Sequence, residues 1–213
     1  MEKRILCFGD SNTWGYNAVD SSRFPKEVRW TRLLQKSLGE GYEIIEEGLS
    51  GRSAVSEDPL NEGLNGFMYI SPCIKSHAPL DLVMIMLGTN DTKERFSLTP
   101  NNIAAGIIRT ASKVKGSLTG RDGKDPLILV VAPPSIGSGY KNADAFLSMG
   151  RECDTKSKEM IPFLKEMALL NGFEFLNADE LVTMNHLDYM HLDIDGHQKM
   201  RKVIEEKILE ILG

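Results

Sequence analysis

Four polar side chains in this chain of 213 residues have the chemistry needed for acyl transfer. Ser11 follows the apolar run 5–8 directly, so its hydroxyl stands at the end of an expected strand. A serine hydroxyl is a weak nucleophile by itself, and it requires a base and donors that stabilise an oxyanion. His191 is the candidate base, and Asp188, three positions earlier, can meet it on one turn of helix-like backbone. Asn90, within Gly88-Thr89-Asn90-Asp91 at the end of another apolar run, offers an amide donor.

Further residues are candidates for supporting roles. The backbone N–H groups of Ser11 and Gly51 can act as additional oxyanion donors. Trp14 can form a wall of an acyl or alcohol pocket, or it can be a core aromatic residue. Arg52 can hold a polar group of a substrate, although pairing with a loop acid is the favoured interpretation. Taken singly, each signal is also typical of a turn, a helix cap or a structural histidine. The chemical interpretation is favoured because the main candidates fall at strand or loop ends on one predicted sheet edge.

The elements that must position these residues alternate between strand and helix patterns. Strands are expected at residues 4–8, 42–45, 81–87, 127–131 and 173–176. Helices are expected at about 26–38, 100–116, 150–170 and 195–212, with Thr99 and Asp195 as N-caps of the second and fourth. This alternation predicts an α/β fold with a five-stranded parallel sheet, helices on both faces and strand order 2-1-3-4-5. No linker divides the chain, so one domain over residues 1–213 is expected.

Two segments are longer than simple connections. Residues 51–79 and 133–149 are expected at the carboxyl edge of the sheet, where ligands bind in open α/β folds. Long loops in a compact domain are often functional. These loops can form a pocket, pack against a neighbouring subunit, or do both.

Composition excludes several classes of protein. The net charge is −5 and the basic residues are dispersed, which argues against a nucleic-acid partner. No apolar run approaches the ~20 residues that cross a bilayer, and the first apolar run is too short for a signal peptide. Cys7, Cys73 and Cys153 show no pairing pattern, which fits a reducing compartment. A cytoplasmic protein with no membrane association is therefore expected.

Four blocks of the chain together carry a resemblance to a known family. They are Gly9-Asp10-Ser11, Leu49-Ser50-Gly51-Arg52-Ser53, Gly88-Thr89-Asn90-Asp91 and Asp188-Tyr189-Met190-His191. In this order they resemble the GDSL, or SGNH, hydrolases, and the neighbouring sequence is closest to the arylesterase and acyltransferase branch. One departure is Asn12, where the family name expects leucine.

The resemblance implies a flavodoxin-like three-layer SGNH hydrolase fold and a serine esterase with no cofactor and no metal. It assigns Ser11 as the nucleophile, Asp188 and His191 as the remaining triad, and Gly51 and Asn90 as oxyanion donors with the Ser11 amide. The branch also implies a homo-oligomer and acyl transfer to alcohols or peroxide. Hydrolysis of small, short-acyl carboxylic esters is the expected activity.

The same residues are also compatible with functions other than hydrolysis of short-acyl esters. Within the esterases, the chain can be a carbohydrate acetylesterase or a lysophospholipase-like lipid esterase. Outside them, it can be a binding module on the same scaffold, because fold does not dictate function. A metal hydrolase is another alternative, because His186, Asp188, His191, Asp193, Asp195 and His197 lie close together in the sequence and include metal-ligand types. Their spacing matches no tight ligand motif, and Asn90 would have no role in it.

Overall fold

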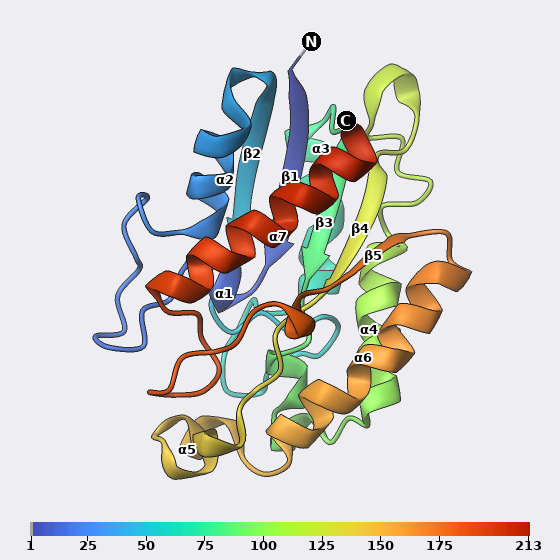
Figure 1. Ribbon diagram of the computed structural model, residues 1–213. Helices are drawn as coiled ribbons and strands as arrows, with labels where there is room; N and C mark the ends of the chain where they lie inside the picture. Colours follow the sequence, from blue (N-terminus) through green and yellow to red (C-terminus); the bar gives the residue numbers. More distant parts are fainter. Residues whose placement is uncertain (1) are drawn as a thin grey trace.

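Five parallel strands form the centre of the computed structural model, which describes residues 2–213 (Figure 1). The strands are β1 (Lys3–Gly9), β2 (Tyr42–Gly48), β3 (Leu82–Met86), β4 (Leu127–Ala132) and β5 (Glu174–Asn177). They pair in the order β2-β1-β3-β4-β5, and every pairing is parallel. The predicted fold class and strand order are confirmed.

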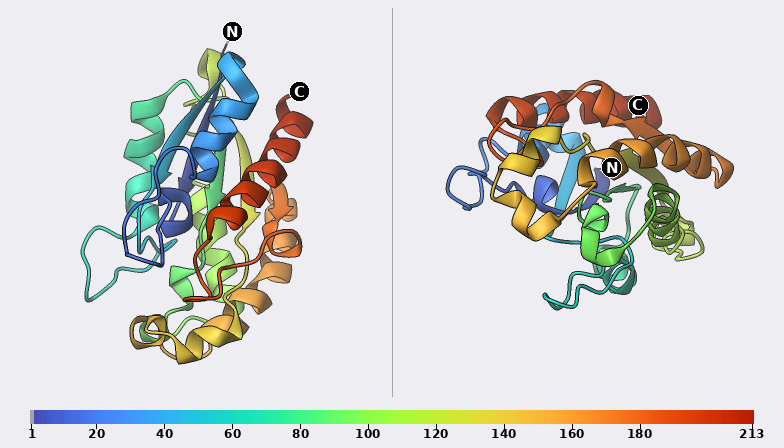
Figure 2. Two further views of the ribbon diagram at one scale, coloured as in Figure 1. Left: turned by 60° about the vertical axis from the view of Figure 1, so that its left-hand side comes forward. Right: turned by 90° about the horizontal axis from the view of Figure 1, so that it is seen from below.

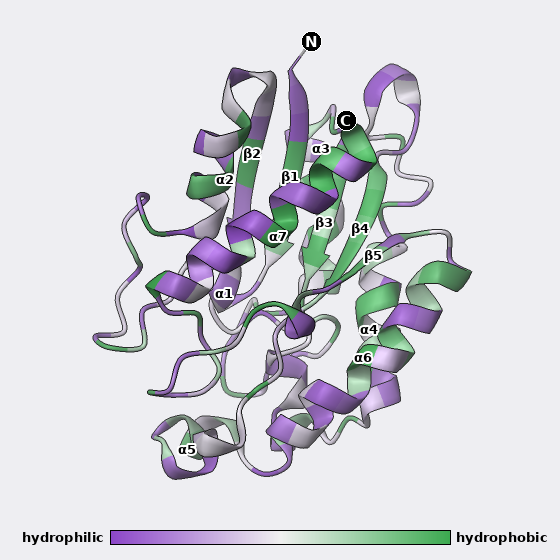
Figure 3. Ribbon diagram, viewed as in Figure 1, coloured by the Kyte–Doolittle hydropathy of each residue, from purple (hydrophilic) through white to green (hydrophobic). Residues whose placement is uncertain are grey.

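Helices cover both faces of this sheet (Figures 1 and 2). The longer helices are α2 (Trp30–Leu38), α3 (Gly66–His77), α4 (Pro100–Ala111), α6 (Cys153–Leu170) and α7 (Ile194–Leu212). Strand β1 shows how two apolar layers arise, because successive side chains point to opposite faces. Ile5 and Cys7 pack in the cluster with α2 and α7, whereas Leu6 and Phe8 pack in the cluster with α3, α4 and α6. Strands β3 and β4 are accordingly hydrophobic along most of their length, whereas β2 at the edge of the sheet also carries polar residues, and the helices carry both kinds (Figure 3).

Several element ends differ from the sequence-based expectation. Helix α2 begins at Trp30 because residues 25–29 form a turn, in which the Val28 N–H donates to the Pro25 carbonyl. The expectation that Asp195 is the N-cap of α7 is also corrected. Asp193 accepts the Gly196 N–H at 2.8 Å and is the N-cap, whereas Asp195 lies in the first turn. Helix α4 has the predicted Thr99 cap, but it ends at Ala111.

The strands run downward in Figure 1, and the carboxyl ends of β1 and β2 meet the short helix α1 (Ser11–Trp14), whereas α5 (Ala145–Met149) lies farther down. Two glycines allow α1 to pack directly on the strand ends. A Cβ atom on Gly48 would lie 2.2 Å from the Trp14 nitrogen, and one on Gly9 would lie 2.0 Å from Thr13 Oγ1. Larger residues at these positions would force the segment that carries Ser11 away from the sheet.

None of the helices within residues 2–213 combines the length and the apolar character that a bilayer crossing requires.

Candidate active site

Ser11 is the first residue of α1, immediately beyond β1. Asp10 caps this helix, and its carboxylate accepts the Asn12 N–H at 3.0 Å. The N–H of Ser11 is one of the helix-start donors that have no acceptor within the helix. The serine is 5% exposed, so its hydroxyl and N–H both lie in a largely water-excluded position.

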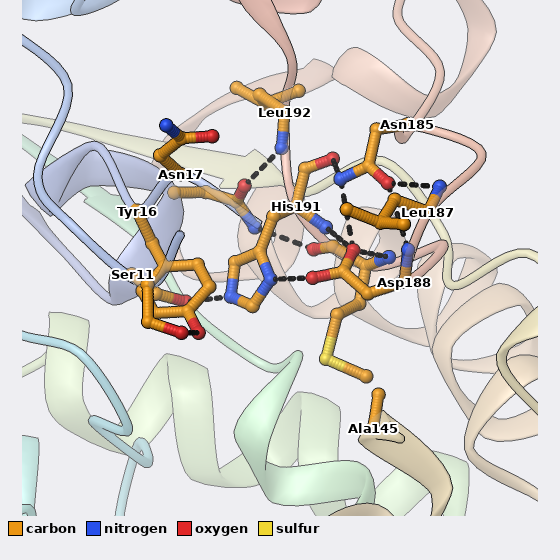
Figure 4. Close-up of polar contacts among 12 residues, drawn as sticks. Ser11, Tyr16, Asn17, Ala145, Asn185, Leu187, Asp188, His191 and Leu192 are labelled. Atoms are coloured by element: carbon orange, nitrogen blue, oxygen red, sulfur yellow. Dashed lines mark hydrogen bonds and ion pairs between the residues drawn. The ribbon is translucent and has the colours of Figure 1, made fainter. Parts of the chain in front are cut away.

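His191 and Asp188 come from the loop between β5 and α7, and they meet Ser11 in a line (Figure 4). His191 Nε2 lies 2.9 Å from Ser11 Oγ, and His191 Nδ1 lies 2.6 Å from Asp188 Oδ2. The expectation of a helix-like turn between the two is corrected. The loop is irregular, and Tyr189 has a left-handed φ of 62°.

The Asp188 carboxylate is fixed by several donors. Its Oδ1 accepts the Met190 and His191 N–H groups at 3.1 Å and the Asn185 side-chain amide at 2.9 Å. Burial alone would raise the pKa of Asp188, but hydrogen bonds and the nearby His191 lower it overall. The residue therefore presents an ionised carboxylate in a fixed orientation to the imidazole.

Asn90 follows β3 and the Gly88-Thr89 turn, and the residue is 7% exposed. Asn90 Nδ2 has no hydrogen-bond partner within residues 2–213, and the same is true of Ser50 Oγ. Gly51 lies opposite in the loop after β2 with φ of 87°, a conformation that glycine adopts without strain. A buried donor without a partner is costly, so Asn90 Nδ2 is suited to an oxygen atom of a ligand.

These groups line one cavity of about 240 Å³. Ser11, Gly51, Asn90 and His191 all contribute to its wall. The sequence-based interpretation missed Tyr16, whose ring centroid lies 4.3 Å from that of His191 (Figure 4). The sequence feature that could have identified Tyr16 is its position close to the Ser11 motif. The two long loops also reach this cavity, as predicted for a pocket.

A charged wall of the cavity was also missed. Lys93 and Arg95 line it, and both approach the buried carboxylate of Asp58. Arg95 donates two hydrogen bonds to Asp58 at 2.7 and 3.1 Å, whereas Lys93 Nζ lies 3.6 Å away. The Arg95 bonds hold the pKa of Asp58 below its usual range. Burial, with the charge of Arg95, lowers the pKa of Lys93. The sequence feature that could have identified Lys93 is its position about one helical turn after Asn90.

Two of the weaker candidates lie elsewhere. Trp14 is not among the residues of the cavity wall, and its ring stacks 5.4 Å from the Arg23 guanidinium. Arg52 is 3% exposed and donates to the backbone carbonyls of Gly9, at 2.9 Å, and Glu47. The possible substrate contacts of these two side chains stay predictions. Arg52 joins the ends of β1 and β2 through backbone oxygens instead of pairing with a loop acid.

Among residues 2–213, the six residues of the metal-hydrolase alternative do not form a cluster of metal-ligating atoms, although Asp188 and His191 contact each other. His197 is buried beneath α2, where its Nδ1 accepts the Trp30 N–H, and Asp195 pairs with Lys199. Within residues 2–213, metal-ligating atoms come together at Glu47, Cys73 and His77, all within 4.8 Å. His77 Nε2 already lies 2.8 Å from Glu47 Oε1, so this carboxylate has a partner inside the protein.

A larger cavity of about 610 Å³ lies near Ser11, His191 and Asp188, between the loop that contains Val19 and the start of α7. Its wall includes the apolar side chains of Phe24, Leu187 and Ile194 but neither Ser11 nor His191. The smaller cavity is therefore the candidate active site, since it alone of the two contains the nucleophile and base geometry.

The buried carboxyl of Asp91 gives a prediction about stability. Burial, with the nearby Asp10, raises the pKa of Asp91 to about 7, although the Ala54 N–H bonds both of its oxygens. Between about pH 4 and about pH 7 the folded protein then holds a proton that the unfolded chain has lost. The free energy of unfolding should fall as pH rises through this window. Asp91→Asn should flatten that slope in urea unfolding measured across the window.

Asp144→Asn serves as the matched control, because Asp144 is an exposed carboxylate. It should leave the slope unchanged. An Asp91→Asn slope equal to that of the unmodified protein would contradict the assignment.

The family model described as GDSL-like Lipase/Acylhydrolase matches residues 5–204, and the chain belongs to this family of ester hydrolases. It is a carboxylic ester hydrolase with the predicted SGNH fold. Comparison with curated proteins finds no match.

Several solved structures are similar to this protein over nearly its whole length. An aryl esterase of M. smegmatis is 36% identical with a TM-score of 0.93, covering 99% of this chain and 100% of that one. A carbohydrate acetylesterase from Sinorhizobium meliloti is 38% identical with a TM-score of 0.92 and the same coverage. A carbohydrate acetylesterase family member from the same organism is 31% identical with a TM-score of 0.90, covering 99% of each chain.

Proposed function

We propose that this protein hydrolyses small, short-acyl carboxylic esters through a Ser-His-Asp triad and an acyl-enzyme intermediate. The observation that carries the proposal is the continuous line of hydrogen-bond distances from Ser11 Oγ through the His191 ring to Asp188, 2.9 and 2.6 Å. In acyl transfer, this arrangement lets a hydroxyl lose its proton to an imidazole that a carboxylate orients.

In the first step, Ser11 Oγ attacks the ester carbonyl carbon while His191 Nε2 takes the hydroxyl proton. Asp188 holds the imidazole by Nδ1 and stabilises the imidazolium that forms. The oxyanion accepts hydrogen bonds from Asn90 Nδ2 and from the N–H groups of Ser11 and Gly51. Support for this comes from the unpartnered Asn90 donor within the cavity that contains Ser11. The alcohol then leaves with the proton from His191, and the acyl group remains on Ser11.

In the second step, water attacks the acyl-enzyme with His191 as the base, and the acid is released. An alcohol or peroxide that enters in place of water would take the acyl group by the same route, which gives acyl transfer. The tilted Tyr16 ring over His191 narrows access to this side of the cavity. Which acceptor prevails depends on its concentration in the cavity.

The size of the cavity supports a short acyl group. About 240 Å³ is below the ~300 Å³ that typically accommodates a drug-sized ligand. A carbohydrate acetylesterase is the second candidate, because two similar structures carry that description and an acetyl group is short. The polar wall with Lys93, Arg95 and Asn61 also suits a hydroxylated alcohol part.

A panel of p-nitrophenyl esters from acetate to octanoate, each with and without added alcohol, tests the proposal. Acetylated sugars form a second arm. A steep fall in kcat/KM beyond butyrate supports the short-acyl assignment, and a preference for long chains would replace it with a lipid esterase. Deacetylation of sugars at rates that match the p-nitrophenyl acetate rate would favour the second candidate. Absence of turnover on every ester would favour a binding module.

Asn90→Ala gives a direct test of the oxyanion donor. Removing one such donor commonly lowers kcat by about 10²–10³-fold, because the donor acts on charge that develops in the transition state. We expect a loss of this size with KM changed much less, measured on p-nitrophenyl acetate. Asn142→Ala, at an exposed position outside the cavity, is the control. A loss below about 10-fold in folded Asn90→Ala would reassign the oxyanion contact.

The homo-oligomer and the cytoplasmic location stay predictions from the sequence. The apolar side chains of Val19, Leu187 and Ile194, all more than half exposed, are compatible with a subunit contact. Light scattering of the purified protein would measure the subunit number.

A further inference from the structure

We infer that Asn12 is a positioning residue that sets the separation of Ser11 and His191. This inference rests on the proposed function, because it assigns a role in the same Ser-His-Asp machinery. Asn12 is the next residue to the nucleophile, is 1% exposed and stands where the family name expects leucine. The proposed acyl-transfer steps need no chemistry from its amide, so the contacts of that amide define its role.

Both ends of the Asn12 amide bind the backbone on either side of His191. Asn12 Nδ2 donates to the Met190 carbonyl at 3.1 Å, and Asn12 Oδ1 accepts the Leu192 N–H at 2.9 Å. Met190 and Leu192 are themselves buried. One side chain therefore hydrogen-bonds both residues that flank the base. This side chain belongs to α1, the helix that carries the nucleophile (Figure 4 shows the bond to Leu192).

Asn12 is in turn anchored to the rest of the fold. Its N–H donates to Asp10 at 3.0 Å, and its carbonyl accepts the Trp30 indole N–H at 2.9 Å. Trp30 is fully buried at the start of α2. The amide thus extends from a rigid support, and it can hold the loop of His191 against α1 without movement of α1 itself.

The loop needs such a restraint because its internal bonds, such as those from Asn185 to the His191 carbonyl, do not fix its place relative to α1. Residues 185–192 are irregular, and the contact between Ser11 and His191 joins residues 180 positions apart. A displacement of about 1 Å in a catalytic group can cost about 10²-fold in rate. Met190 and His191 form only part of the cavity wall, so the effect should fall mainly on kcat.

The test compares Asn12→Leu with the unmodified protein. Asn12→Leu removes both amide bonds, and we expect kcat on p-nitrophenyl acetate to fall about 10–100-fold with KM within about 3-fold. The rate at which an organophosphonate labels Ser11 should fall in parallel, because that reaction also needs the base. Circular dichroism at the assay temperature establishes that each variant is folded. Asn12→Ser removes the same bonds without adding volume. If the leucine variant does not fold, this serine variant tests the positioning role in its place.

Asn171→Leu is the matched control. Asn171 also binds a backbone carbonyl through its amide, that of Met167 at 2.8 Å, but it lies at the end of α6 away from the cavity. It should lower thermal stability without changing kcat or the labelling rate. Wild-type kcat in a folded Asn12 variant would overturn the positioning role. Full activity in Ser11→Ala would instead overturn the proposed function, so the two failures are distinguishable.

Discussion

Replacing Ser11 with alanine should lower kcat on p-nitrophenyl acetate by about 10⁴-fold or more while the fold stays intact. The alanine methyl group cannot attack the carbonyl carbon, and His191 would then have no hydroxyl to deprotonate. Loss of a serine nucleophile in a triad is among the largest single-residue effects known in catalysis. The fold should persist because the Ser11 hydroxyl is bound only to His191 among residues 2–213.

The measurement is a progress curve at high enzyme concentration, with a thermal unfolding curve of the same sample. Ser138→Ala is the control, since Ser138 is exposed and lies outside the cavity. Mass spectrometry after organophosphonate treatment adds a second readout. The adduct should appear in the unmodified protein and be lost in Ser11→Ala. A variant that keeps more than about a tenth of the activity would exclude Ser11 as the nucleophile.

Asp188→Asn should lower kcat by about 10⁴-fold, the effect seen when a triad aspartate becomes an amide. The amide would donate to His191 Nδ1 at the place where the carboxylate accepts, at 2.6 Å. The imidazole would then carry its proton on Nε2, toward Ser11, and could not accept the serine proton. The amide also carries no negative charge to stabilise an imidazolium.

The pKa of Asp188 sets the pH range of this comparison. Because that pKa lies below its ordinary value, the carboxylate stays ionised at neutral and moderately acidic pH. The stability that its ionised form contributes is present above the unfolded pKa and is lost as pH falls through the folded pKa. Asp122→Asn, at an exposed position, is the control for charge removal. An Asp188→Asn kcat within about 10-fold of the unmodified value would remove Asp188 from the proposed triad.

Much of the architecture followed from the sequence alone, because it depends on local patterns. Apolar runs such as 82–86 are buried on both faces, which is typical of central parallel strands. The carboxyl ends of parallel strands share one edge, so Ser11 after β1 and Asn90 after β3 had to lie near each other. The predicted sheet order and fold class were confirmed for that reason.

The tertiary structure decided the parts that depend on distant contacts and on irregular backbone. The line from Asp188 to His191 is made by a loop with a left-handed Tyr189, a geometry that no helical spacing rule describes. Trp14 and Arg52 follow the right motifs but lie outside the cavity wall, because packing sets where a side chain points. Sequence patterns determine elements through interactions between near neighbours, whereas Asn12 and Leu192 meet only because the folded chain brings together residues that are 180 positions apart.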